Sequence, residues 1–300
     1  MYKDLLTLRD INPAELEELF ALTDKLKAGR GTVGCDILKG KSIGLIFAKS
    51  STRTRVSFEV GVHELGGNPL YLDSTKMQLG RGETVADTAH VLSRYLHGLV
   101  IRTYSQADVE ELAREATFPV INALTDDYHP CQILADLYTI KEYSGTTKVK
   151  TVFVGDGASN IANSLMLGAK LSGMQLVVAS PKEYAPNAEI LAECAPFAQW
   201  CEDPVEAMKD ADYVYTDVWV SMGFEEEKAR RMALFQPYQV NRAIFDLASP
   251  NCKFLHCLPA HRGEEVTADV LDSASSIVYD EAENRLHVQK ALMAKLIGKN

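Results

Sequence analysis

The chain has 300 residues, of which 46% are hydrophobic and 24% charged, values ordinary for a soluble globular protein of one large or two ordinary domains. Its formal net charge is −10, and no basic stripe offsets it, which argues against a nucleic-acid partner. An anionic ligand would therefore have to be held by local arginines. No apolar run approaches the length of a membrane span, so we expect no membrane partner.

The cysteines predict free thiols in a reducing compartment. They include no Cys-x-x-Cys pair, and their spacing suits neither a disulfide framework nor a zinc site, so we expect no bound metal. The first residues contain neither a signal-peptide core nor an Arg-rich transit segment. We therefore expect a cytoplasmic protein. The cysteines are Cys35, Cys131, Cys194, Cys201, Cys252 and Cys257.

The first half of the chain alternates between predicted helices and strands. A helix should begin at Asn12-Pro13, where a capping side chain precedes a proline, and end at Gly29. Short apolar runs predict strands at 43–47, 70–72, 99–101 and 120–122. Polar starts followed by helical periodicity predict helices near 84–96, 105–116 and from Pro130. This alternation is typical of a parallel sheet covered on both faces.

The segment Ser51-Thr52-Arg53-Thr54-Arg55 stands where the strand at 43–47 turns into a helix. Free backbone N–H groups and the positive end of the helix dipole point into such a turn. Three hydroxyl groups and two guanidinium groups join them. A capped helix with two surface arginines is the simpler interpretation, but arginines in a first turn oppose the dipole. A bound dianion such as a phosphate group would explain them.

The second half repeats the alternation after a polar stretch at 144–150. Strands are expected at 152–154, 176–178, 213–215, 254–256 and 277–279, and helices near 160–172, 186–195, 225–235 and 282–297. The predicted fold is α/β, with two doubly wound parallel-sheet domains. The expected boundaries are 1–143, joined by the last helix at about 282–300, and 144–281. Ligands of such sheets bind beyond the carboxyl ends of the strands.

The Ser-Thr-Arg-Thr-Arg segment resembles the phosphate-binding signature of the carbamoyltransferases. His129-Pro130-Cys131-Gln132 is similar to the His-Pro-x-Gln motif of that family. The resemblance implies that His129 and Gln132 contact a carbamoyl group and that Arg102, which ends a predicted strand, bridges phosphate and carbonyl oxygen. Without the resemblance, Arg102 and His129 could equally be a surface arginine and a loop histidine.

The turn Gly155-Asp156-Gly157-Ala158-Ser159-Asn160 follows a predicted strand and opens a helix. A dinucleotide fingerprint would need a third glycine where Asn160 stands, which disfavours that interpretation. Ornithine carbamoyltransferases carry an asparagine in this turn that binds the amino acid, often as Asn-Asn. Only Asn160 is matched here.

Two further loops follow predicted strands. Asp217-Val218-Trp219-Val220-Ser221-Met222-Gly223 resembles the Asp-x-Trp-x-Ser-Met-Gly loop of ornithine carbamoyltransferases, which suits an α-amino-acid zwitterion. His256-Cys257-Leu258-Pro259 resembles the signature that separates them from aspartate carbamoyltransferases, which carry His-Pro-Leu-Pro. A buried structural Cys257 is the alternative, and a zinc site with Cys252 fits no usual spacing.

The resemblance spans almost the whole chain and implies carbamoyl transfer from carbamoyl phosphate to the δ-amine of L-ornithine, giving L-citrulline and phosphate, with no cofactor. It also implies a homotrimer in which the loop carrying Gln78 reaches into a neighbouring subunit's site. The expected catalytic residues are Cys257, Arg102, His129 and Asp217. Carbamoyl phosphate would contact Ser51, Thr52, Arg53, Thr54, Gln78, Arg102, His129, Gln132, Cys257, Leu258 and Arg285, and ornithine would contact Asn160, Asp217, Ser221 and Met222.

Other substrates and another class of protein stay open at this point. Aspartate is disfavoured, because Met77-Gln78-Leu79-Gly80-Arg81 replaces the Ser-x-x-x-Lys loop of aspartate enzymes. Putrescine lacks the α-carboxylate and α-amine that Asn160 and Asp217 are expected to hold, whereas an N-acylated ornithine is not excluded. A non-catalytic metabolite-binding α/β protein is the alternative from another class. The chain does not distinguish arginine synthesis from arginine breakdown.

Overall fold

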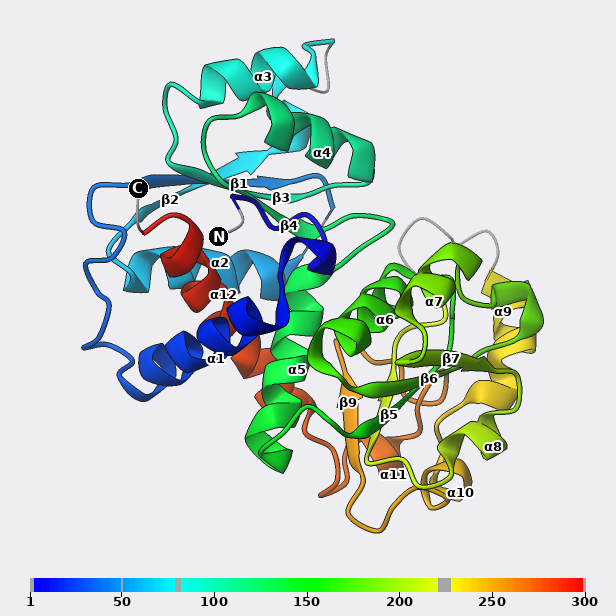
Figure 1. Cartoon of the computed structure of the whole chain (residues 1–300). Helices are drawn as coiled ribbons and strands as arrows, with labels where there is room; N and C mark the ends of the chain where they lie inside the picture. The colour runs from blue at the N-terminus through cyan, green and yellow to red at the C-terminus, as the bar shows by residue number, and fades with distance from the viewer. Residues whose placement is uncertain (1–2, 50, 79–81, 221–227, 299–300) are drawn as a thin grey trace. The chain divides into compact units, whose positions relative to one another are not determined.

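The computed structural model describes residues 3–49, 51–78, 82–220 and 228–298 (Figure 1). By contacts, the chain divides into two compact units. Unit 1 comprises Met1–Ala135 and Glu283–Asn300, and unit 2 comprises Asp136–Ala282. The first division falls inside helix α5 (Pro130–Ser144), ahead of the 143/144 boundary expected from the polar stretch, and the second falls inside α12 (Val278–Leu296).

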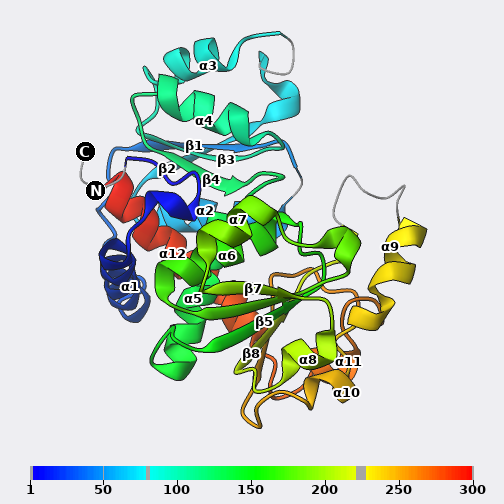
Figure 2. The ribbon, with the colours of Figure 1, turned by 45° about the vertical axis from the view of Figure 1, so that its right-hand side comes forward.

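Unit 1 is built on a four-stranded sheet in the order β2-β1-β3-β4, and every pairing is parallel. Helices α3 and α4 cover one face, and α1, α2 and the C-terminal part of α12 lie against the other (Figures 1 and 2). The strands are β1 (Ser42–Phe47), β2 (Asn68–Asp73), β3 (Gly98–Arg102) and β4 (Val120–Leu124), and the helices are α1 (Pro13–Ala28), α2 (Thr52–Glu64), α3 (Val85–Leu92) and α4 (Gln106–Glu115), with short 3-10 turns at Leu8–Asp10 and Ser74–Lys76.

Central strands buried on both faces explain why this sheet is parallel. All five residues of β3 are buried, and in β1 only Ser42 retains intermediate exposure. Ile46 and Ile101 pack against Val109 and Leu112 of α4 in a continuous apolar cluster. Burying such side chains contributes about 1.5–3 kcal/mol each relative to exposure. In these two central strands, polar side chains therefore stand at the ends. At the carboxyl end, β3 finishes with Arg102, and β1 is followed by the start of α2.

Unit 2 is built on a five-stranded sheet in the order β7-β6-β5-β8-β9, again with every pairing parallel. Helices α6 and α7 lie over one face and α8, α10 and α11 over the other (Figures 1 and 2). The strands are β5 (Lys150–Val154), β6 (Gln175–Ala179), β7 (Ala198–Cys201), β8 (Tyr213–Thr216) and β9 (Lys253–His256), and the helices are α6 (Asn160–Ser172), α7 (Ala188–Cys194), α8 (Pro204–Met208), α9 (Lys228–Phe235), α10 (Arg242–Phe245) and α11 (Ala268–Leu271), with 3-10 turns at Lys182–Tyr184 and Gln236–Tyr238.

The predicted α/β fold with two parallel-sheet domains is confirmed. The start of α1 is also as predicted: Asn12 caps the helix by accepting from the Glu15 N–H at 3.0 Å, and Pro13 is its first residue. Of the predicted helix at 225–235, the part before Lys228 lies outside the described residues.

The predicted strand at 277–279 is wrong, and strand β7 was missed. Ser276 makes one isolated bridge to Phe254 of β9, and Val278 already belongs to α12. Asp280 and Glu281 favour a helix there because they lie in its first turn, where the dipole stabilises acidic groups. Strand β7 lies at the sheet edge and reads Ala-Gln-Trp-Cys with only its first residue buried, so it contains no apolar run that would predict a strand. Within the described ranges, no helix combines the length and the apolar composition needed to cross a bilayer.

Candidate active site

The turn between β1 and α2 has the geometry expected for an anion site. Ser51 is the N-cap of α2, with φ −161° and ψ 113°, and its hydroxyl accepts from the Thr54 N–H at 3.3 Å. Thr54 is 2% exposed, while Thr52 and Arg53 remain exposed on the first turn. The first turn contains no acidic residue. Its partial positive charge is therefore available to a ligand.

The two arginines of the motif take different roles. Arg55 is bound on the flank of unit 1: its Nε donates to Glu59 Oε1 at 3.1 Å, and its guanidinium carbon stands 3.7 Å from the centre of the Tyr71 ring. Arg53 instead belongs to the electrostatic environment of His129. Arg55 is thus engaged by Glu59 and Tyr71, while the expectation that the Arg53 guanidinium binds an anion at the turn stays a prediction. Sequence alone could not distinguish them, because Glu59 and Tyr71 lie on α2 and β2.

Two arginines, Arg102 and Arg285, lie with His129 in a buried cluster of unit 1. Their exposed fractions are 7%, 3% and 5%. Burial lowers the pKa of His129 well below its usual value, and the charges of Arg285, Arg102 and Arg53 lower it further. The imidazole is therefore neutral at physiological pH and can donate a hydrogen bond to a carbonyl oxygen without adding charge. Concentrated guanidinium charge around it favours an anionic ligand.

Arg285 connects the last helix to both motifs of unit 1. One of its terminal nitrogens donates to the side-chain oxygen of Gln132, and the other donates to the Thr54 hydroxyl at 3.1 Å. Gln132 is 1% exposed, so it is held as part of the interior. The structure thus brings together Thr54, His129, Gln132, Arg102 and Arg285. Gln78 is exposed in the loop after β2.

Lys49 is a residue of this region that the sequence analysis did not single out. It follows β1, is 9% exposed, and forms an ion pair with Asp126 in the loop after β4. Its ammonium group also lies 4.4 Å from the centre of the Tyr104 ring. The signal was available, because a lysine directly after a buried parallel strand stands at the edge where ligands bind.

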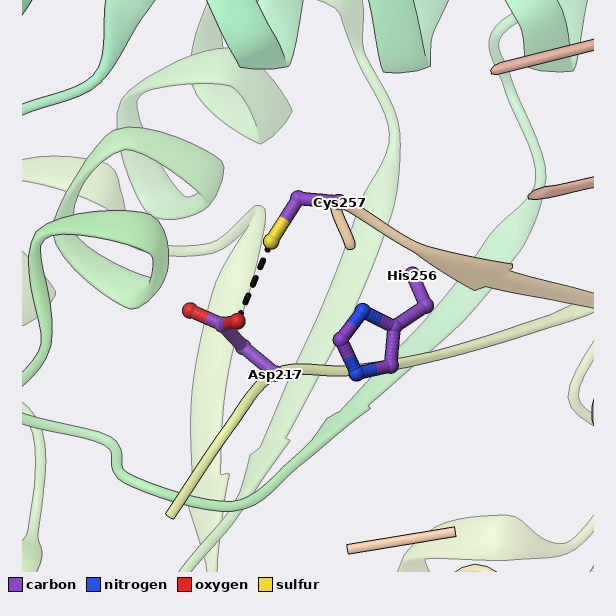
Figure 3. A group of neighbouring side chains, drawn as sticks. All are labelled: Asp217, His256 and Cys257. Atoms are coloured by element: carbon purple, nitrogen blue, oxygen red, sulfur yellow. Dashed lines mark hydrogen bonds between the residues drawn. The ribbon is translucent and has the colours of Figure 1, made fainter. Parts of the chain in front are cut away.

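In unit 2, a thiol and a carboxylate meet at the ends of β8 and β9. The Cys257 thiol donates to Asp217 Oδ1 at 3.1 Å, as Figure 3 shows. The same Asp217 oxygen accepts from the Val218 N–H at 2.8 Å. Burial raises the pKa of Cys257 well above its usual value, and the charge and hydrogen bond of Asp217 raise it further. The thiol is therefore protonated at neutral pH.

His256 supports this corner without entering the thiol–carboxylate bond. The ring is fully buried, and its Nδ1 accepts from the Leu258 N–H at 2.9 Å. Nδ1 then carries no proton, so Nε2 carries it and donates to Glu265 Oε1 at 3.0 Å. Leu258 has φ +57°, a left-handed conformation that costs a non-glycine residue roughly 1–2 kcal/mol. The bond to His256 helps to hold the Cys257–Leu258 corner in this strained form.

The side chains of Asp217, His256 and Cys257 offer ligand atoms within 4.8 Å of one another, which raises the question of a metal at this corner. Both ring nitrogens of His256 are already engaged, one as an acceptor and one as a donor. Only Asp217 and Cys257 would remain, and their nearest atoms share a proton. Two ligands fall short of the three or four that zinc sites use.

The turn that opens α6 approaches its neighbours closely. Gly155 has φ +146°, and a Cβ on Gly157 would stand 2.7 Å from both Ser180 Oγ and the Tyr184 carbonyl oxygen. Any larger residue would displace that backbone. Ser159 caps α6 by accepting from the Ala162 N–H at 3.2 Å, which leaves Asn160 as the partly exposed first residue of the helix. Asn160 therefore stands at the carboxyl end of β5.

Arg231 is a second residue that the sequence did not reveal. It is 4% exposed, donates from Nε to the Trp219 carbonyl oxygen, and forms an ion pair with Asp156. Its guanidinium carbon also stands 4.4 Å from the centre of the Tyr184 ring. Arg231 thereby ties the loop after β8 to the turn after β5. Ser221 and Met222, expected to bind ornithine, lie outside the described residues.

Comparisons with known proteins agree with this picture over the full chain. Residues 3–142 match the carbamoyl-P binding domain of aspartate/ornithine carbamoyltransferases, and residues 147–296 match their Asp/Orn binding domain. The ornithine carbamoyltransferase of Oceanobacillus iheyensis is 53% identical, with 99% of this chain and 94% of that protein covered.

Solved structures with the same fold include the ornithine carbamoyltransferase of Pyrococcus furiosus, with a TM-score of 0.94 and 50% identity over 99% of this chain and 98% of that one. The anabolic ornithine carbamoyltransferase of Campylobacter jejuni has a TM-score of 0.93 and 37% identity, covering 99% of this chain and 100% of its own. The chain therefore belongs to the aspartate/ornithine carbamoyltransferase family.

Proposed function

We propose that this protein transfers the carbamoyl group of carbamoyl phosphate to the δ-amine of L-ornithine, giving L-citrulline and phosphate. The observation that carries the proposal is the cluster of Arg53, Arg102 and Arg285 around neutral His129, beside the N-terminus of α2. Guanidinium groups and free helical N–H groups together suit a phosphate dianion. The full-length likeness to ornithine carbamoyltransferases supports the choice of donor and acceptor.

The residues of unit 1 bind carbamoyl phosphate and stabilise the leaving phosphate. The hydroxyls of Ser51, Thr52 and Thr54 and the guanidinium of Arg53 take the phosphate oxygens. Arg102 and His129 donate to the carbamoyl oxygen, where negative charge develops when the amine attacks. Gln132 and Arg285, which are hydrogen-bonded to each other, bind the carbamoyl group. Arg285 also donates to Thr54 in the first turn of α2. The charge of the leaving group is met by these cations, so the scheme uses no cofactor.

The residues of unit 2 bind ornithine. Asn160 and Asp217 take its α-carboxylate and α-amine with Ser221 and Met222, while Cys257 and Leu258 face the carbamoyl carbon. The amine nitrogen forms a bond to that carbon and the bond to the phosphate oxygen breaks. Of the two protons that the ammonium group loses, one goes to the leaving phosphate and the other to water. An alkylammonium group has a pKa of about 10.4, so deprotonation at neutral pH costs about 4–5 kcal/mol. Because the Cys257 thiol is itself protonated, it orients the amine and Asp217 rather than acting as a thiolate base.

The protein is proposed to work in the cytoplasm as a homotrimer with shared sites. The exposed position of Gln78 in the loop after β2 is compatible with contact to a neighbouring subunit, as in the family. The chain would serve arginine metabolism, in either direction.

The first prediction concerns the acceptor. Colorimetric detection of ureido products, run in parallel with ornithine, N-acetylornithine, putrescine and aspartate, should give product with ornithine and at least tenfold less with each of the others. A site built to hydrogen-bond an α-amine or α-carboxylate rejects analogues that lack it, because its polar groups are then left unpaired. A higher rate with N-acetylornithine or putrescine would assign a different acceptor, and no product with any amine would overturn carbamoyl transfer itself.

The second prediction separates the two arginines of the phosphate motif. Arg53→Ala should weaken binding of inorganic phosphate about tenfold or more, the amount expected for a lost charge-assisted hydrogen bond. Arg55→Ala, the matched control two residues on, should stay within about threefold of the unmodified protein, because Arg55 is bound to Glu59 and Tyr71. Titration calorimetry measures both. Equal losses in the two variants would remove Arg53 from the anion site.

The third prediction concerns the thiol. Cys257→Ala should bind phosphate normally but lose most turnover, whereas Cys257→Ser, which keeps a donor for Asp217, should retain more activity than Cys257→Ala. A thiolate base would make serine as poor as alanine, because a hydroxyl is far harder to ionise.

Since the pKa of Cys257 is raised, its alkylation by iodoacetamide should be slow at neutral pH and accelerate as pH rises. Exposed Cys35 provides the internal reference. Unchanged turnover in Cys257→Ala would exclude the thiol from the mechanism.

The fourth prediction tests shared sites. Gln78→Ala and Cys257→Ala chains should each be nearly inactive alone. After unfolding and refolding together, mixed trimers should regain activity, because some sites then combine an intact Gln78 with an intact Cys257 from different chains. Mixing without refolding is the control. Activity at dilutions where sedimentation detects only monomer would refute the shared-site proposal.

A further inference from the structure

We propose that the loop after β9 carries a second site, distinct from the carbamoyl-transfer residues, that binds one divalent transition-metal ion through His261, Glu264 and Glu265. None of the three belongs to the expected substrate contacts. The proposal rests on their geometry and burial, so it stands or fails independently of the transfer reaction.

The geometry brings three metal-ligating atoms together within one short loop. His261 Nδ1 lies 3.9 Å from Glu264 Oε2 and 3.8 Å from Glu265 Oε2, and all three ligand atoms fall within 4.8 Å of one another. Gly263, with φ +90°, lets the chain turn between the histidine and the two carboxylates. The residue spacing is compact enough that side-chain rotation alone can bring the atoms closer.

Glu265 supplies an observation that is independent of this clustering. Its side chain is fully buried, and its Oε1 accepts from His256 Nε2 at 3.0 Å and from the His261 N–H at 2.6 Å. Its other oxygen, Oε2, has no hydrogen-bond partner among the described residues, although it is turned toward His261. A buried carboxylate oxygen without a partner is costly unless a cation meets it. A metal ion held jointly with His261 and Glu264 would supply that cation.

The donor set restricts the kind of ion. One imidazole nitrogen and two carboxylate oxygens suit zinc, cobalt and similar borderline ions, with water completing the coordination. Zinc bonds to such atoms are about 2.0–2.2 Å long, so the three ligand atoms must draw together when the ion binds. His261 is half exposed and Glu264 is partly exposed, so both can move toward buried Glu265. Lys228 Nζ, 3.4 Å from the other oxygen of Glu264, is an exposed competitor for that carboxylate.

The position of Glu265 links this site to the Cys257–Leu258 corner. The carboxylate holds the Nε2 proton of His256, and His256 Nδ1 holds the backbone of Leu258. An ion on Oε2 would draw charge away from Oε1 and weaken its hold on His256. Metal binding should therefore loosen the strained backbone of Leu258, the residue next to Cys257.

The fifth prediction is a test of this site with cobalt(II). The full chain carries Cys35→Ser to remove the exposed thiol. We expect one equivalent of cobalt to bind, with visible d–d bands and no thiolate-to-cobalt charge-transfer band. His261→Asn and Glu264→Gln should each weaken binding about tenfold or more. His90→Asn is the matched control, because exposed His90 also pairs with a glutamate, Glu115 at 3.3 Å, but forms no three-ligand group with other described residues.

Adding the substitution Cys257→Ser to the Cys35→Ser chain distinguishes the proposed metal site from binding at the Cys257 thiol. The spectrum and the affinity should be unchanged, because the proposed ligands contain no sulfur. A charge-transfer band that disappears with Cys257→Ser would place the ion at Cys257 and overturn the proposal. So would binding that survives both His261→Asn and Glu264→Gln, or the absence of saturable binding. Circular dichroism confirms folding of each variant, and the substitutions at His261 and Glu264 are chosen because neither side chain is in the core.

Discussion

The constraint on which unit 1 depends is the concentration of guanidinium charge around a buried, neutral imidazole. Burial and the nearby Arg285, Arg102 and Arg53 all lower the pKa of His129. Placing such charges in an interior is costly, and in a folded protein the cost is offset only by hydrogen bonds or by an opposite charge. Arg285 recovers part of it through Gln132 and Thr54. A phosphate dianion would offset more of this cost, which is consistent with the proposed anion site.

Unit 2 shows the opposite electrostatic character. The pKa values of Cys257 and Tyr215 are raised by burial and by the negative charges of Asp217, Asp136 and Glu281. An acidic environment of this kind suits a substrate that carries ammonium groups. In the proposed reaction the two units would sort the reactants by charge: the cationic cluster would bind the anionic donor and the acidic region would bind the cationic acceptor. The overall charge of −10 describes neither region, which is why it argued against a nucleic-acid partner but did not indicate where charged ligands would bind.

Much of the fold was readable from the sequence because its signals are local. Helix α6 was predicted with its observed bounds, and the cap at Asn12 and the N-terminus of α2 follow from residues within one turn. The strand wrongly predicted at 277–279 shows that a short apolar run does not by itself distinguish a strand from the start of a helix. Here the acidic residues that follow favour a helix. The edge strand β7 offers no apolar run, because only its first residue is buried, whereas the equally short β8 and β9 are mostly buried and were predicted.

The site residues that sequence reasoning missed owe their roles to distant partners. Arg231 matters because Trp219 and Asp156 come to it from other loops, and Lys49 because Asp126 follows a different strand. Arg53 and Arg55 look alike in the sequence, and the contacts of Arg55 with Tyr71 and Glu59 become visible only in the structure. Local spacing carries no information about such pairs. The roles assigned to His129, Gln132 and Cys257 rest on motif likeness, which carries over contacts that spacing alone does not encode, and they stay predictions.

The protonated thiol bears on the hardest step of the proposed reaction. Although Asp217 is expected to hold the α-amine, its full negative charge beside Cys257 would also stabilise the ammonium form of the attacking δ-amine and so oppose its deprotonation. The Cys257 S–H bond to Asp217 Oδ1, together with the Val218 N–H bond to the same atom, withdraws negative charge from that oxygen. Each hydrogen bond to the charged form makes the carboxylate a weaker partner for the ammonium group. We infer that the thiol lowers the cost of freeing the amine by moderating Asp217, a role that requires it to keep its proton.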